Sequence, residues 1–143
     1  MPFDGSTYQD TSLSHVDATV LRGKLYAERM RYAEAAKQTS AIISLLRDPN
    51  HWCKGVERLS VRHLYFFTKH RMCVLGAMKT VGCSGLVQQE IIRFIPSKYF
   101  DCIPNWNDDS ETTHPDVLRV LRAVKIHFTA RFLELDERIK SLA

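Results

Sequence analysis

The chain has 143 residues, 45% of them hydrophobic and 25% charged, which is the composition of one globular domain and excludes a disordered or fibrous protein. Its net charge of +4 is compatible with acidic partners but requires none. We expect a cytoplasmic protein with reduced thiols and no membrane contact, because the sequence lacks an apolar run of roughly 20 residues, a signal peptide pattern and any Cys-x-x-Cys pair.

The N-terminal third is predicted to be helical after a polar start. Residues 1–12 are expected to form a flexible tail, and residues 13–143 a single helical domain. Ser14 with Asp17 resembles a capping box, and residues 48–50, Asp-Pro-Asn, end the helix. Gly23 and residues 39–40 are weak helix formers, so two helices that meet at a bend are an alternative to one long helix. One face of this helix carries Leu21, Leu25, Tyr32, Ala36, Ile43 and Leu46.

The middle of the chain changes its periodicity several times. Residues 53–69 are predicted to form a small hairpin or an irregular segment, with one strand near residues 56–61 and a second strand or buried loop at residues 64–67. Two short helices follow, at residues 72–82 and 86–96. Residues 97–112 read as a turn-rich loop in which Asn and Asp side chains bind local backbone groups.

The last helix has the strongest pattern. Thr113 and Asp116 form a possible capping box, and Pro115 lies in the first turn. The apolar residues that follow at helical spacing are Val117, Leu121, Val124, Phe128, Phe132, Leu135 and Ile139. The predicted fold is therefore mainly α, a compact helical domain in which long N- and C-terminal helices pack on two short central helices.

Three short signatures occur in a fixed order before this helix: Trp52-x-x-Gly55, Cys73-x-x-Gly76-Ala77 and Asn107-Asp108. Over residues 36–124 the chain resembles a small domain family of unknown function from actinobacteria and their bacteriophages. The resemblance implies a bacterial or phage source and a cytoplasmic setting, the host cytoplasm if a phage encodes the protein. It brings no activity and assigns no catalytic residue, and residues 56–70 depart from the pattern by being more apolar and more basic.

Cys73 is the candidate nucleophile. In the first turn of a helix its thiolate would be favoured, with His63 or His70 as base and Asn107 or Asp108 as orienting group. The alternative is a buried cysteine in a helix of small residues, because free cysteine is among the most buried residue types.

Two further clusters could hold a metal or a ligand. His51, Cys53, His70 and Cys73 supply the four ligands of a tetrahedral zinc site, although their spacing is unlike that of common zinc fingers. Trp52 and Trp106 could flank a pocket with Asn107 and Asp108 as polar contacts, or both could fill the core. We expect neither a metal nor a cofactor.

The basic and aromatic residues near the hairpin offer contact surfaces. Tyr65, Phe66 and Phe67 are the candidate contact for a protein partner or a second copy. Nucleic acid, if bound, would meet Arg58, Arg62, Lys69 and Arg71. No acid and base pair or phosphate loop is present, so we expect a noncatalytic binding or accessory module, with nucleic-acid binding and a Cys73-dependent enzyme as alternatives.

Overall fold

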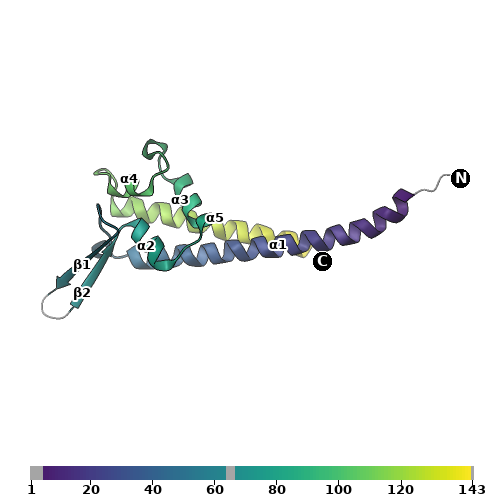
Figure 1. The fold of residues 1–143 in the computed structure, drawn as a ribbon, viewed down its shortest axis with the longest axis horizontal. Coiled ribbons are helices and arrows are strands. Elements are labelled where there is room, and N and C mark those ends of the chain that lie inside the picture. The colour runs from purple at the N-terminus through teal and green to yellow at the C-terminus, as the bar shows by residue number, and fades with distance from the viewer. Residues whose placement is uncertain (1–4, 64–66, 143) are drawn as a thin grey trace.

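Two long helices lie side by side and antiparallel, and the shorter elements gather at one end of the pair (Figure 1). The computed structural model describes the backbone of residues 5–63 and 67–142, and the side chains of residues 16–57 and 71–142. Helix α1 spans Gly5–Leu46 and helix α5 spans His114–Ser141, and the contact between them is the most extensive in the fold. The predicted pairing of long terminal helices is confirmed.

Helix α1 differs from the prediction at its start and along one face. It begins at Gly5, so Ser14 lies inside the helix rather than capping it, and no break occurs at Gly23. The flexible tail stays a prediction only for residues 1–4, which lie outside the described residues. Leu25, Ile43 and Leu46 are buried as expected, whereas Leu21 is exposed, because α5 ends beside Arg22, whose side chain donates to the Leu142 carbonyl.

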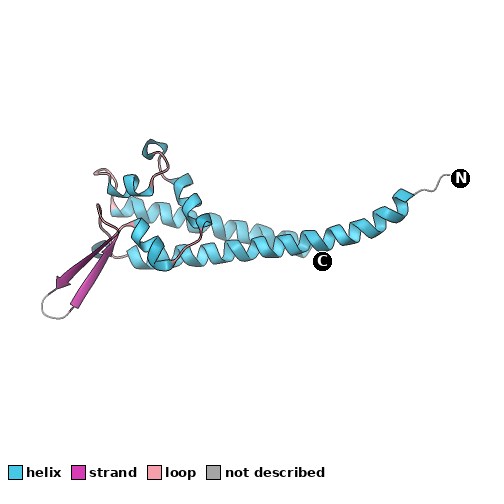
Figure 2. Ribbon diagram, in the orientation of Figure 1, coloured by secondary structure: helices cyan, strands magenta, loops and turns pink. Residues whose placement is uncertain are grey.

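The hairpin follows a single turn of 3-10 helix, Pro49–His51, whose N-cap Asp48 accepts a hydrogen bond from the Asn50 N–H. Strand β1, Arg58–His63, pairs antiparallel with strand β2, Phe67–Met72, so that Arg58 faces Met72 and His63 faces Phe67. The second strand therefore begins where the expected one at residues 64–67 ends. Residues 64–66 lie outside the described residues. The hairpin projects from the helical body (Figure 2).

The central helices are α2, Val74–Val81, and α3, Gly85–Phe94, close to their predicted places. Gly82 ends α2 in the left-handed conformation, and its N–H donates to the Met78 carbonyl, a common helix stop. The expected loop at residues 97–112 is partly helical, which corrects the sequence prediction. It contains a 3-10 turn, Ser97–Tyr99, and helix α4, Ile103–Asp108, because buried Ile103, Trp106 and Asn107 tie this segment to the body.

Two clusters of buried apolar side chains hold the helices together. The larger lies at the end where the short helices pack, and its fully buried members include Ile42, Leu46, Ile91, Leu121 and Phe128. The smaller consists of Leu25, Leu135 and Ile139, further along the helix pair. Among the described residues, none of the helices combines the length and the apolar character that crossing a membrane requires.

Candidate functional site

The three sequence signatures meet at the side chain of Asn107. Its Oδ1 accepts hydrogen bonds from Trp52 Nε1 at 2.8 Å and from the Val74 N–H at 3.1 Å. Its Nδ2 donates to the Cys53 carbonyl at 3.0 Å and to Asp108 Oδ1 at 2.8 Å. One buried amide therefore joins the Trp52 turn, the start of α2 and helix α4. We call these five residues the Asn107 cluster.

Asp108 and its neighbour extend this cluster to the turn before the hairpin. Asp108 Oδ1 accepts a second hydrogen bond, from the Gly55 N–H at 2.8 Å, and Lys54 Nζ donates to the Asp109 carbonyl. Gly55 has a φ of +82°, a conformation that other residues rarely adopt, so the glycine of the Trp-x-x-Gly signature allows the turn to present its N–H to Asp108.

Cys73 and Gly76 fix the other side of the hairpin base. Cys73 is the N-cap of α2 and is only 4% exposed, and its Sγ accepts a hydrogen bond from the Gly76 N–H at 3.3 Å. The Cys73 N–H donates to the Glu57 carbonyl at 3.2 Å, and a Cβ at Gly76 would overlap that same carbonyl. Cys73 thus lies one position before the first turn of α2 and not, as the sequence predicted, within it, and Gly76 permits the chain that leads into β1 to pass directly over α2.

The two tryptophans lie in different environments. Trp106 is 2% exposed and belongs to the large core cluster. Trp52 is half-buried, its ring lies 5.9 Å from that of His114, and Lys54 lies over it. Both hydrogen-bonding atoms of the Asn107 amide point inward to protein groups, so this arrangement matches the core-filling alternative better than a shared ligand pocket. His114 in turn contacts the Leu46 carbonyl at the end of α1, 2.6 Å from its Nε2.

Two of the thiols, those of Cys53 and Cys83, have a raised pKa. Burial raises the pKa of the Cys53 thiol, nearby Cys73 and Asp108 raise it further, and Arg71 lowers it. Burial likewise raises the pKa of Cys83. Because the thiolate is the nucleophile, Cys53 and Cys83 are in surroundings that suppress reactivity. His63 and His70, the predicted bases for Cys73, have side chains outside the described set, and Asp108 faces Gly55 and Asn107.

The predicted zinc ligands are brought together only in part. Cys53 and Cys73 flank the hairpin base, and nearby Cys73 contributes to the raised pKa of Cys53, while His51 ends the 3-10 turn. Within the side chains that the structure describes, no three His, Cys, Asp or Glu residues are placed to hold a metal ion. The role of His70 in such a site stays a prediction.

The structure describes the predicted aromatic and basic contact residues only in part. Phe67 opens β2, and Tyr65 and Phe66 fall outside the described residues. Arg58, Arg62 and Lys69 are strand residues whose side chains are not described, and Arg71 is half-buried at the base. The strand pairing places Arg62 opposite Thr68 and Lys69 opposite Val61, so both strands carry basic residues.

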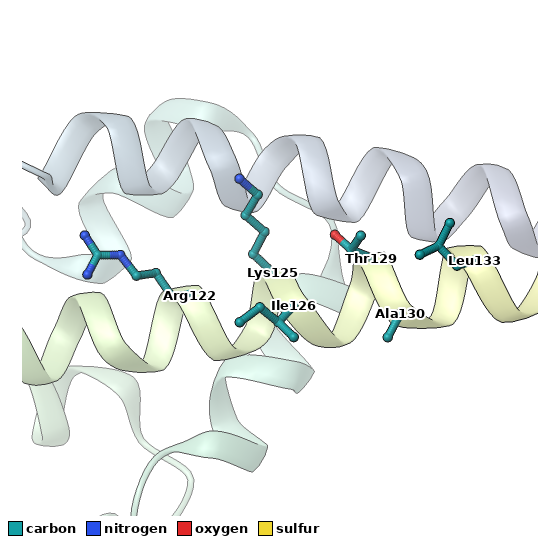
Figure 3. Close-up of a pocket in the computed structure, with 6 residues that line it drawn as sticks. All are labelled: Arg122, Lys125, Ile126, Thr129, Ala130 and Leu133. Carbon is teal, nitrogen blue, oxygen red and sulfur yellow. The ribbon is translucent and has the colours of Figure 1, made fainter.

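Sequence reasoning missed two concave surfaces. One lies between α5 and the segment around Tyr99 and Trp106, and its rim carries Lys98, Glu111, Asp116 and Arg119 in two internal ion pairs. The other is a shallow apolar surface along α5, formed over successive turns by the residues in Figure 3: Arg122, Lys125, Ile126, Thr129, Ala130 and Leu133. On the first surface, Lys98 is paired with Glu111 and Arg119 with Asp116. These charges neutralise one another, so the surface favours neither an anionic nor a cationic ligand.

The fold and the Asn107 cluster define a class of protein: a mainly helical domain with a long antiparallel helix pair and a hairpin held by buried polar side chains. A model described as a family of unknown function, DUF6197, matches residues 30–125, and the chain belongs to this family. The three signatures all lie within the matched residues. No curated protein and no solved structure matches the chain.

Proposed function

We propose that this protein is a noncatalytic binding module that acts through a protein partner or a second copy of itself, with the β1–β2 hairpin as its contact element. The supporting observation is that the Asn107 amide has all its hydrogen bonds within the protein. The most distinctive polar side chain of the sequence therefore holds the hairpin base and is not free for a substrate.

The hairpin needs this support. A lone two-stranded hairpin is marginally stable in water. Here hydrogen bonds tie both of its ends to the body, from the Cys53 N–H to the Met72 carbonyl and from the Cys73 N–H to the Glu57 carbonyl. A projecting element that the body fixes at both ends can meet a partner at a small entropic cost, and the proposed contact residues are Tyr65, Phe66 and Phe67.

Site-specific photocrosslinking tests the contact element. A photoreactive phenylalanine analogue at Phe66 should give a discrete higher-mass species in cells that naturally make the protein. The same analogue at Phe100, an aromatic residue 87% exposed on another part of the surface, is the matched control and should give none. No product from position 66, or equal products from both positions, would contradict the assignment to the hairpin.

The same experiment separates the alternatives. A nuclease-sensitive product would favour nucleic-acid binding, for which the basic residues of both strands provide the motivation, and retention on DNA or RNA should then fall steeply with salt. An enzyme dependent on Cys73 predicts rapid alkylation of that thiol by iodoacetamide at neutral pH in the folded protein. We expect Cys73 to stay unmodified until the protein unfolds, because its Sγ is buried and hydrogen-bonded.

The proposed setting is the cytoplasm of a bacterium or of a phage-infected host. The order of the three signatures supports the bacterial or phage source. The four cysteines are all free, which fits a reducing compartment. A tagged copy expressed in the source organism and followed by cell fractionation would test this proposal directly.

A further inference from the structure

Helix α1 has a second apolar stripe that nothing in the described chain covers. Val16, Val20 and Met30 are 53%, 51% and 67% exposed, and Gly23 and Ala27 between them are also exposed. The five residues are separated by 4, 3, 4 and 3 positions, which is the a and d spacing of a coiled coil. We call Val16, Val20, Gly23, Ala27 and Met30 the α1 stripe.

The α1 stripe lies on the side of the helix opposite to α5. Successive helical residues are rotated by about 100°, so positions two apart point in nearly opposite directions. Leu25, two positions after Gly23, is buried against Leu135 and Ile139 of α5. Within the described chain, this part of α1 therefore packs against α5 on one side and against no other element over the α1 stripe.

The part of α1 before Arg22 also extends beyond the end of α5. Arg22 donates to the Leu142 carbonyl, which marks the place where α5 ends, and α1 continues past it to Gly5 (Figure 1). A helix without tertiary contacts is marginal in water, since most helical stability in proteins comes from packing of an apolar face. A second helix on the α1 stripe would supply that packing.

We propose that the α1 stripe binds the α1 stripe of a second copy of this chain, in antiparallel orientation. In antiparallel coiled coils an a residue packs against a d residue. A two-fold axis between Leu21 and Arg22 places Val20 opposite Gly23 of the second copy and Val16 opposite Ala27 of the second copy. Each valine then meets a small residue, and a Cβ at Gly23 would meet nothing within the monomer, so that position is open to the incoming valine.

Charge complementarity supports this orientation. Asp17 and Lys24 are exposed and flank the α1 stripe on the same side, each at the position after a d residue. The antiparallel register brings Asp17 of each copy beside Lys24 of the other, which gives two symmetric ion pairs. A parallel register instead sets Lys24 opposite Thr19 and Arg31 opposite Tyr26, with no opposite charges.

This inference goes beyond the proposed function of the hairpin and does not depend on it. The α1 stripe lies almost entirely before residue 30, where the family match begins, and at the far end of the helix pair from the hairpin. An experiment that excludes the dimer therefore leaves the hairpin contact untouched, and the reverse also holds.

Sedimentation velocity on the full chain tests the dimer. The wild-type protein should form a dimer in a concentration-dependent manner, and Val20→Glu should be monomeric over the same range. Ile126→Glu is the matched control, because Ile126 is 69% exposed on the apolar surface of α5, and it should remain dimeric. Circular dichroism should show both variants folded, since both side chains face solvent in the monomer. A wild-type monomer up to millimolar concentration, or loss of the dimer in the Ile126 variant alone, would overturn the proposal.

A charge exchange tests the orientation. Lys24→Asp should raise the dimer dissociation constant roughly ten-fold, because two exposed ion pairs become two repulsions. Adding Asp17→Lys should restore the wild-type constant. Asp17 and Lys24 are two helical turns apart in one chain, too far to pair with each other, so rescue has to come from contact between copies. Absence of rescue would exclude the antiparallel register.

Discussion

Asn107 concentrates several roles in one side chain, and its removal tests the assignment of the Asn107 cluster. Asn107→Ala should lower the free energy of unfolding by about 2–4 kcal/mol, because buried partners, including the Val74 N–H and the Cys53 carbonyl, lose their hydrogen bonds. Asn105→Ala, an exposed position on the same helix, should change it by no more than about 0.5 kcal/mol. Urea denaturation measures both. Equal effects would mean that the buried amide has no special role.

Gly76 offers a second test at this scale. Gly76→Ala should destabilise the protein by about 2 kcal/mol or more, because its Cβ would overlap the Glu57 carbonyl and force β1 away from α2. Gly85→Ala is the control, since a Cβ there meets nothing, and it should be neutral or stabilise by up to about 1 kcal/mol. Thermal unfolding distinguishes the two variants. A harmless Gly76→Ala would show that the Glu57 segment can move aside.

The sequence could identify part of the Asn107 cluster but not its arrangement. The Trp-x-x-Gly and Asn-Asp signatures contain Trp52, Asn107 and Asp108, which belong to the cluster, and the Cys-x-x-Gly-Ala signature contains Cys73, which adjoins it. Their spacing, however, contains no information on which backbone groups the Asn107 amide would meet, since these lie 33 and 54 positions away in the chain. Long-range hydrogen bonds of this kind leave no periodic signal.

Among the elements, α5 was predictable because local chemistry defines its start. The Thr113 side chain accepts from the Asp116 N–H, and the Asp116 carboxylate accepts from the Thr113 N–H at 2.9 Å, which completes the capping box. Helix α4 was missed because its sequence, Ile-Pro-Asn-Trp-Asn-Asp, has turn-forming residues at four of its six positions. Tertiary contacts of Trp106 and Asn107 override that preference.

The capping box predicts a pH dependence of stability. Hydrogen bonds from the Thr113 N–H and hydroxyl, with Arg119 nearby, hold the pKa of Asp116 below its ordinary value of 3.8. The folded state thus binds this proton less readily than the unfolded state. The stabilisation is complete above the ordinary value and is lost as the pH falls through the lowered pKa.

Asp116→Asn should therefore reduce the acid sensitivity of the protein. The free energy of unfolding of the wild type should fall more steeply below pH 4 than that of the variant, as measured by urea denaturation across the acid range. At neutral pH the variant should be the less stable of the two, because the neutral amide is a weaker acceptor for the Thr113 N–H. Parallel pH profiles would show that other carboxylates govern acid unfolding.

The second apolar stripe of α1 shows why periodicity alone is insufficient for a long helix. Leu21, Leu25 and Tyr32 lie on one face, yet Leu21 is exposed while Leu25 is buried, because α5 ends beside Arg22. A helix with apolar residues on two sides gives overlapping patterns, and the sequence cannot tell which of them faces α5. The structure separates the two faces and leaves Val16, Val20 and Met30 without a partner in the described chain.

At the scale of the whole molecule, the two core clusters predict two levels of stability. The larger cluster joins α1, α5 and the short helices, whereas the smaller one consists of Leu25, Leu135 and Ile139. Ion pairs accompany the smaller cluster, such as Arg29 with Asp136 at 2.6 Å, but exposed and half-exposed pairs contribute at most about 1 kcal/mol each. The C-terminal turns of α5 should therefore open at a lower free energy than its first turns.

Hydrogen exchange with two core variants measures this difference. Leu135→Ala should accelerate amide exchange mainly in residues 132–141, because it removes the central member of a three-residue cluster that can open while the larger cluster stays intact. Phe128→Ala should accelerate exchange throughout the chain and lower the free energy of unfolding by about 3–5 kcal/mol, since Phe128 is fully buried in the larger cluster. If Leu135→Ala also accelerated exchange in α2 and α3, the helix pair and the short helices would unfold as one cooperative unit, and the smaller cluster would be as essential to the fold as the larger.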